Sequence, residues 1–302
     1  MTGDEAQTMT AGEASAADTL VEAIEGAEPL DRIATPLSRL VRGALPSGDV
    51  KDALSGTWLG HPLHPVLTDV VVGSLLSASA LDLLAGRGAD PARERLVALG
   101  MLAYAPTAAS GASDWTDAAV DPRVKRVGIV HAMVNLAGVT LYAASLPAGR
   151  RGSRASAIAL RAAGAGAFVV GGFLGGHLSF RRNVGPDQTA FDPGPSDWTA
   201  AVDGSQLVER RPYRAIVGDT PVLLVLDGER IHAIHDRCSH RGCSLSEGEL
   251  EGEEVVCACH SSRFSLADGS VRHGPAVAPQ PAFDVRRQGN IVEVRLRGAD
   301  SE

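Results

Sequence analysis

The sequence predicts a bundle of four membrane-spanning α-helices followed by a small antiparallel β domain. Four stretches between residues 65 and 180 are apolar over close to the ~20 residues that a helix needs to cross the hydrocarbon core of a bilayer. After residue 197 the pattern changes to short runs suited to β-strands, separated by turn residues such as Asp227-Gly228 and Gly289-Asn290. The length of 302 residues is consistent with two domains.

The N-terminal region, residues 1–54, is expected to be acidic and largely disordered. Its first part is rich in Ala and acidic residues and has few bulky apolar side chains with which to form a core. Residues 33–45 are the exception, because Leu37, Leu40, Val41 and Ala44 fall on one helical face, which predicts a short amphipathic helix at a membrane surface. The net charge of -8 and the lack of a long basic run argue against nucleic acid as a partner.

Residues 55–182 are predicted to form the membrane domain. Short loops rich in Arg, Gly and Pro separate its apolar stretches, which are 65–85, 96–111, 127–146 and 155–180. A soluble bundle would carry polar residues along one side of each helix, whereas these stretches are apolar all round apart from isolated ionisable residues. The soluble bundle stays open as an alternative because many of the apolar residues are small.

Isolated polar residues are expected to gather at one membrane edge. Four crossings return the chain to its starting side, so the start of the first and third helices and the end of the second and fourth share that edge. Ionisable groups in a membrane span are costly and usually paired, which makes the gathering a candidate site. The residues are His61, His64, Asp69, Asp114, His131 and His177.

Three interpretations of this polar edge remain open. The histidines can simply pair with the aspartates, two of them can supply the axial ligands of a haem, or they can hydrogen-bond a quinone in an apolar pocket. The motifs His-Pro-Leu-His-Pro at 61–65 and Gly-Gly-His-Leu-Ser-Phe at 175–180 resemble an uncharacterised family of four-helix bacterial membrane proteins. That resemblance implies a multi-pass location in the cell membrane, with the lipid bilayer as a partner, and no established activity.

Two cysteine and histidine loops carry the sharpest chemical signal in the chain. They read Cys238-Ser-His240 and Cys257-Ala-Cys-His260. An iron–sulfur cluster with two cysteines on one iron and two histidines on the other needs four ligands converging from two loops. Two Cys and two His can also hold a tetrahedral zinc ion, which is the alternative interpretation.

These loops and their flanks lie in a predicted domain over residues 198–302, and they resemble the Rieske [2Fe-2S] family from about Trp198 to Leu296. The run Ser-Ser-Arg-Phe at 261–264, Asp-Gly at 268–269 and Gly-Pro-Ala at 274–276 is similar to that family's pattern. The resemblance implies that a [2Fe-2S] cluster is ligated by Cys238, His240, Cys257 and His260. It further implies a disulfide between Cys243 and Cys259, as in Rieske proteins of the cytochrome bc kind. The residues expected to surround the cluster are Ser262, Phe264, Gly274 and Pro275.

Three positions depart from the quinol-oxidising members of that family. Arg241 replaces a usual apolar residue, Ser261 a usual glycine, and Phe264 a frequent tyrosine. Because hydrogen bonds to the cluster sulfurs raise the reduction potential, loss of the tyrosine hydroxyl predicts a lower potential than in those proteins.

The membrane domain and the Rieske-like domain together predict a membrane-anchored one-electron carrier. Such a protein acts as an electron-transfer component of an oxidoreductase system rather than as a stand-alone enzyme. Its redox donor and acceptor proteins are not identified by the sequence. A membrane-bound redox sensor is the alternative function. The oxygenase class is set aside because it needs a large domain with a mononuclear iron after the Rieske segment. A linker over residues 183–197 would place the Rieske domain on the same side as the N-terminus, and the cytoplasmic face is favoured.

Overall fold

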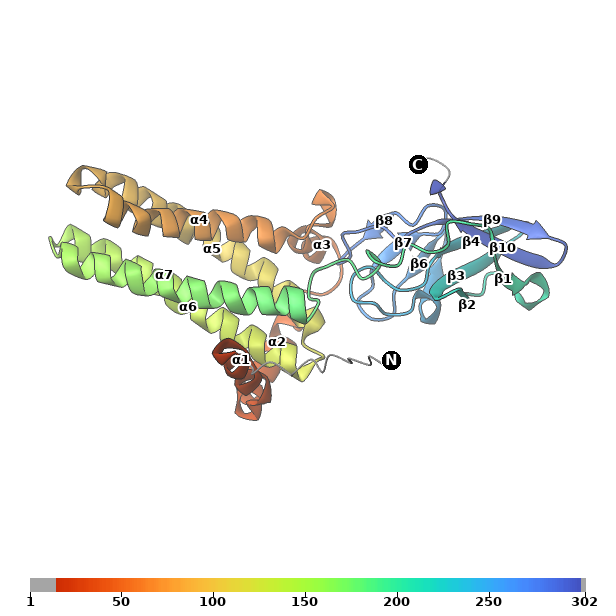
Figure 1. Ribbon diagram of the computed structural model, residues 1–302, viewed down its shortest axis with the longest axis horizontal. Coiled ribbons are helices and arrows are strands. Elements are labelled where there is room, and N and C mark those ends of the chain that lie inside the picture. Colours follow the sequence, from red (N-terminus) through yellow and green to blue (C-terminus); the bar gives the residue numbers. More distant parts are fainter. Residues whose placement is uncertain (1–14, 300–302) are drawn as a thin grey trace, which may run out of the picture.

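The computed structural model describes residues 15–299. A bundle of long helices lies at one end of the molecule and a β domain at the other, with a single extended connection between them (Figure 1). The start of the first and third long helices and the end of the second and fourth face the β domain, as the order of crossings predicts.

The bundle consists of α4 (Leu63–Leu84), α5 (Asp90–Ala118), α6 (Pro122–Arg150) and α7 (Arg154–Gly176), and a π-helical turn, His177–Arg181, continues α7. All four are long and apolar enough to cross a membrane. The sequence predicted each of these helices, but α5 has 29 residues and extends well beyond 96–111 at both ends. A proline in its first turn and good helix formers such as Ala, Arg and Glu beside the apolar stretch account for the extension.

Apolar side chains occupy both the inside and the outside of the bundle. Leu75 and Tyr142 are fully buried in its core. On the outer surface Leu83 is 87% exposed and Leu102 is 76% exposed. An apolar outer surface is expected of helices that contact lipid.

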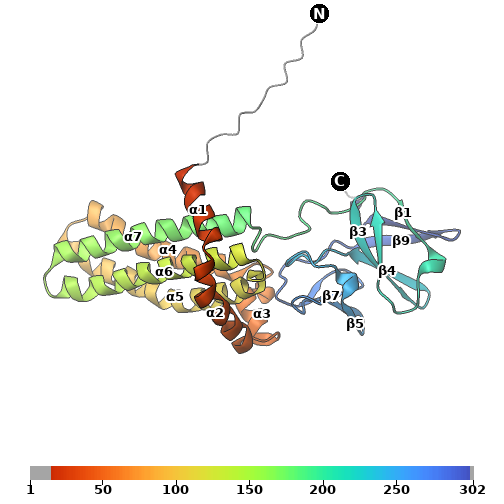
Figure 2. The same cartoon turned by 90° about the horizontal axis from the view of Figure 1, so that it is seen from below.

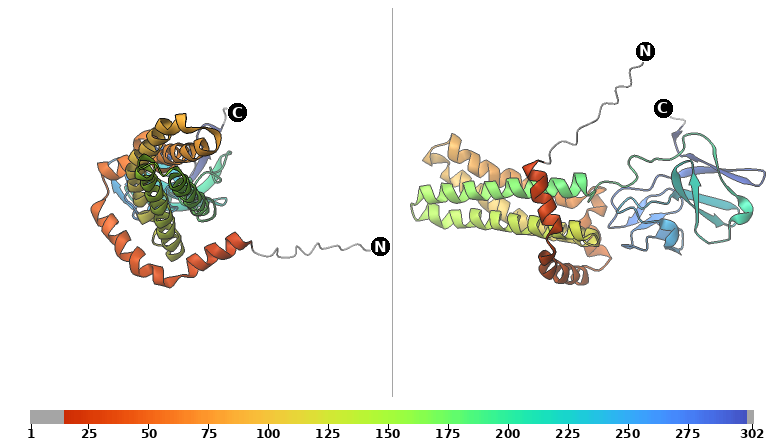
Figure 3. Two further views of the ribbon diagram at one scale, coloured as in Figure 1. Left: turned by 90° about the vertical axis from the view of Figure 1, so that its left-hand side faces the viewer. Right: turned by 60° about the horizontal axis from the view of Figure 1, so that its bottom comes forward.

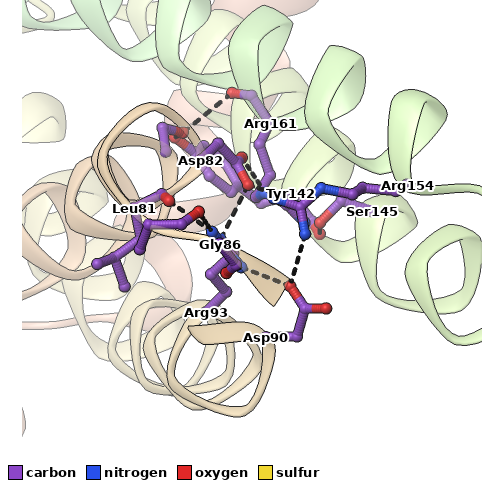
Figure 4. A network of polar contacts seen from close by, with 11 residues as sticks. Leu81, Asp82, Gly86, Asp90, Arg93, Tyr142, Ser145, Arg154 and Arg161 are labelled. Carbon is purple, nitrogen blue, oxygen red and sulfur yellow. Dashed lines mark hydrogen bonds and ion pairs between the residues drawn. The ribbon is translucent and has the colours of Figure 1, made fainter. Parts of the chain in front are cut away.

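A buried ionic network joins the helices at the end far from the β domain (Figure 4). Asp82 of α4 accepts two hydrogen bonds from Arg161 of α7, at 2.6 and 2.7 Å. Arg93 of α5 forms an ion pair with the same carboxylate at 3.0 Å and also donates to the carbonyls of Leu81 and Ala85 at the end of α4. One carboxylate therefore holds three helices together.

Replacing Asp82 by Asn should destabilise the bundle, because two buried guanidinium groups would lose their shared counter-charge. Removing one partner of a buried ion pair costs about 3–5 kcal/mol. The thermal melting of helical circular dichroism in detergent should fall for Asp82→Asn. Glu94→Gln, which removes an exposed carboxylate paired with Arg150 at 3.2 Å, is the matched control and should melt like the wild type. Equal melting of both variants would contradict a structural role for the network.

The N-terminal region differs from the expected disorder. Helices α1 (Ala16–Gly26), α2 (Asp31–Ala44) and α3 (Asp49–Ser55) form there, while residues 1–14 lie outside the described part of the chain. Figures 2 and 3 show α1 and α2 lying across the outside of the bundle, close to its β-domain end. A helix therefore forms over the predicted amphipathic segment 33–45.

Two interactions that the composition did not reveal explain why α1 is ordered. Ser15 and Asp18 form a reciprocal capping box at its start. Val21 is buried against Val127 and Leu174 of the bundle. The order comes from docking onto α6 and α7, a tertiary contact that a composition argument cannot detect.

The β domain contains three small antiparallel sheets, with strand orders β1-β10-β9, β2-β3-β4 and β5-β6-β7-β8. The strands are β1 (Thr199–Asp203), β2 (Tyr213–Val217), β3 (Thr220–Asp227), β4 (Arg230–His235), β5 (Glu249–Glu251), β6 (Glu254–Val256), β7 (Arg263–Ser265), β8 (Val271–His273), β9 (Phe283–Gln288) and β10 (Ile291–Leu296). One apolar core lies between the first two sheets, and a second lies where β3 meets the cysteine loops. This second core supports the candidate site.

Candidate metal centre

The first cysteine and histidine loop leaves β4 and is held by a buried carboxylate. Asp236, which is fully buried, accepts hydrogen bonds from the Ser244 hydroxyl and from the backbone N–H of Ser246. Within the loop, the N–H of Cys238 donates to the carbonyl of Cys243 at 2.8 Å. The loop is therefore closed on itself, and Cys238 and His240 project from a fixed backbone.

The second loop connects β6 and β7 through a tight turn. The N–H of Cys257 donates to the carbonyl of Ser262, and the N–H of Ser261 donates back to the carbonyl of Cys257, both at 2.9 Å. Ser261 has φ of 61°, in the left-handed region where a side chain is strained. This backbone conformation favours glycine, the residue that the family resemblance led us to expect at position 261.

Ser261→Gly should stabilise the chain, because glycine adopts the left-handed region without the steric cost of about 1 kcal/mol. The melting temperature of the variant should rise relative to wild type. Ala258→Gly, in the same loop but without a positive φ, is the control and should leave the melting temperature unchanged or lower it. A fall in melting temperature for Ser261→Gly would show that the serine side chain makes a contact worth more than the strain.

A disulfide joins the two loops. Cys243 and Cys259 are bonded across a Cα–Cα distance of 6.5 Å, whereas Cys238 and Cys257 are free and buried. The sulfur of Cys257 lies within 4.8 Å of both disulfide sulfurs. Because bonded sulfurs offer no thiolate, the free thiols of Cys238 and Cys257 are the sulfur ligands available to a metal.

The four expected ligands fit a [2Fe-2S] cluster. The rings of His240 and His260 lie 5.0 Å apart and perpendicular to each other. Nδ1 of His240 is buried and has no hydrogen-bond partner within residues 15–299. Since buried polar atoms nearly always have a partner, a bond from this nitrogen to iron would complete its environment.

Three of the four groups already have a protonation state suited to metal binding, whereas Cys238 must lose its proton when a metal binds. Burial lowers the pKa of His240 well below its usual value and lowers that of His260 as well, so both imidazoles are neutral. A hydrogen bond with Cys238 lowers the pKa of Cys257 to about 6 and raises that of Cys238. Neutral imidazole and thiolate are the forms that ligate a metal.

Residues 197–284 match the family model described as Rieske [2Fe-2S] domain. The ferredoxin component of biphenyl 2,3-dioxygenase from Rhodococcus jostii (strain RHA1) is 37% identical over 81 residues, which are 27% of this chain and 76% of the relative. The chain belongs to the Rieske [2Fe-2S] family. A [2Fe-2S] cluster is therefore the expected cofactor, and the zinc alternative loses its support.

Two further proteins are similar to the same Rieske segment. The anthranilate 1,2-dioxygenase ferredoxin subunit of Burkholderia cepacia is 27% identical over 101 residues, covering 33% of this chain and 94% of the relative. The structure of the ferredoxin of carbazole 1,9a-dioxygenase from Nocardioides aromaticivorans IC177 is 30% identical, with a TM-score of 0.32, and matches 34% of this chain and all of that chain. Residues 60–188 match a second family, described as predicted membrane protein (DUF2231).

The residues predicted to surround the Rieske cluster are all buried. Phe264 is fully buried in the second core beside Cys238 and Cys257. The hydroxyl oxygen of Ser262 accepts a hydrogen bond from the N–H of Ala276 at 3.1 Å, and so joins the second loop to the third. Gly274 and Pro275, connected by a cis peptide bond, belong to that third loop.

The third loop is also held by the helical part of the chain. Asp52 of α3 accepts from the N–H of Gly274 and from Nδ1 of His273, both at 3.0 Å. The Thr57 hydroxyl donates to the carbonyl of Ala276 at 3.3 Å. A Cβ at Gly274 would lie only 2.1 Å from Oγ1 of Thr57, so this close approach requires glycine.

A second cross-domain contact reaches a cluster ligand directly. Nε2 of His240 lies 3.6 Å from Oδ2 of Asp117, in the last turn of α5, and Oδ1 of Asp117 accepts from Nζ of Lys51 at 2.9 Å. Sequence analysis did not select Lys51, Asp52 or Asp117. Asp117 lies three residues after Asp114, beyond the end of the predicted span 96–111, so the signal that selected Asp114 could also have found it.

The six polar residues predicted at the membrane edge do not form one group. His64 and His131 are near each other, and Asp114 lies near Asp117 and Lys51. His61 and Asp69 are exposed at the outer surface. His177 instead contacts Glu25 of α1 at 2.9 Å.

Helix geometry explains this correction. Asp69 follows His64 by five residues, which turns it by ~140° around α4 to the outer side. His177 pairs with Glu25 because α1, expected to be disordered, docks onto α6 and α7. Only His64 and His131 therefore remain as a histidine pair inside the bundle.

Proposed function

We propose that this protein is a membrane-anchored one-electron carrier, an electron-transfer component of an oxidoreductase system. Its cluster would be held by Cys238 and Cys257 on one iron and by His240 and His260 on the other. The observation that carries the proposal is the convergence of two free, buried thiols and two imidazoles on loops closed by a disulfide. The similar dioxygenase ferredoxin components support a role in passing electrons to a partner protein.

The membrane anchor is supported by four long helices with an apolar outer surface and by the similarity to a predicted membrane protein family. In such an anchor, α2 would lie at the bilayer surface, because Leu37 and Leu40 are exposed on it and Arg39 stands between them. The Rieske domain and the N-terminal helices lie at the same end of the bundle, so both would face the same side of the membrane, which we propose is cytoplasmic.

His64 and His131 are the proposed site of a second redox group, haem or quinone, within the bundle. The Nδ1–H of His64 donates to the carbonyl of Thr107 at 3.0 Å, and that of His131 to the carbonyl of Gly171 at 2.8 Å. Such bonds orient an imidazole and leave its Nε2 as the nitrogen for a haem iron or a quinone oxygen. The pair lies in helices whose ends face the Rieske domain.

Electron paramagnetic resonance of the dithionite-reduced protein tests the cluster. We expect a mixed-ligand [2Fe-2S] signal with a potential between about -150 and +300 mV. His240→Ala and Cys257→Ser should each abolish the signal, because each removes an iron ligand. His232→Ala, which changes a histidine of β4 that is not an expected ligand, is the control and should retain it. Purified protein that holds a single colourless metal ion would exclude the carrier.

Membrane fractions of an expressing strain test the second redox group. Difference spectra should show a haem band, or added quinol should reduce the cluster, and both His64→Ala and His131→Ala should remove that behaviour while the cluster signal persists. His61→Ala changes an exposed histidine of the same segment and should have no effect. If wild-type membranes show neither a haem band nor quinol-dependent reduction, the second redox group is absent.

A further inference from the structure

The carboxylate of Asp117, at the end of α5, faces the expected cluster ligand His240. The side chains of Asp117 and His240 are 5% and 15% exposed, and Oδ2 of Asp117 points at Nε2 of His240 across 3.6 Å. Within residues 15–299, Oδ2 has no hydrogen-bond partner. Its other oxygen is held by Lys51, whose side chain is only 6% exposed. A buried carboxylate oxygen without a hydrogen-bond partner is rare, so we expect a hydrogen-bond donor to bind at this position.

Iron binding would supply that donor. A neutral imidazole has one ring proton, and when Nδ1 of His240 binds iron the proton must lie on Nε2, the atom that faces Asp117. A carboxylate that accepts from a ligating histidine makes the imidazole a stronger electron donor to the metal. The negative charge of Asp117 also stabilises the more positive, oxidised cluster.

Lys51 opposes this effect. Its ammonium lies 2.9 Å from the same carboxylate, on α3, which also carries Asp52 at the third loop. A positive charge near the cluster favours the reduced state, and partial neutralisation of Asp117 weakens its interaction with His240. Other charged groups lie near the same edge and contribute to the reduction potential in every variant. These groups are Arg42, Asp114, Asp121 and Arg241.

We propose that the helical domain sets the reduction potential of the Rieske cluster through His240, with Asp117 lowering the potential and Lys51 raising it. Both are positioning residues rather than ligands. The inference rests on the proposed function, since it requires the cluster. It implies that the domain contact through Asp52, Thr57 and Asp117 is part of the redox centre and not only an attachment.

A redox titration followed by electron paramagnetic resonance tests this in the full-length protein. Asp117→Asn keeps the shape and removes the charge, so its potential should rise relative to wild type. Lys51→Met should lower the potential. The double variant should fall between the two single variants. Glu94→Gln removes one negative charge from the far end of the same helix and should leave the potential unchanged.

A second measurement distinguishes a direct contact between Asp117 and His240 from a general effect of charge on the cluster. The hyperfine couplings of the histidine nitrogens report electron donation by the imidazole ligands, and they should change in Asp117→Asn but not in Glu94→Gln. If Asp117→Asn does not accumulate because Lys51 is left unpaired, Lys51→Met and the double variant decide the question. Potentials equal to wild type in these variants, or a lowered potential in Asp117→Asn, would overturn the inference. Loss of the cluster signal in wild type would instead overturn the proposed function.

Discussion

The arrangement of the β domain depends on one constraint: two thiols and two imidazoles must converge in a small volume from loops far apart in the chain. Each loop is closed by its own backbone hydrogen bonds, and the disulfide between Cys243 and Cys259 joins them. The fully buried Asp236 fixes the first loop, and a left-handed Ser261 completes the second turn. The strained backbone at Ser261 and the buried charge of Asp236 therefore both help to position the expected cluster ligands.

The same constraint extends into the helical domain. The third loop carries Gly274 against Thr57 and Asp52, and one cluster histidine faces Asp117. Because this histidine is a proposed cluster ligand, a carboxylate and an ammonium placed beside it would act on the cluster itself. Under this proposal the helical domain would influence the cluster in addition to anchoring it.

The bundle shows where a local pattern succeeds and where it fails. The number and order of the helices follow from the length of their apolar stretches, a local property. The predicted polar residues lie toward the same end of the bundle but do not form one cluster, because Asp69 turns outward and His177 pairs with Glu25. Helix α1 was missed because Val21 is ordered by the bundle against which it packs.

The sequence alone determined the Rieske family and the apolar helices, because both the cysteine and histidine motifs and the length of the apolar stretches are properties of consecutive residues. Only the tertiary structure decided which groups meet the cluster edge. Lys51 meets Asp117 across 66 positions, and Asp52 meets Gly274 across 222. Contacts over such separations depend on how two folded domains dock, and that docking is fixed by the packing of surfaces rather than by any local pattern.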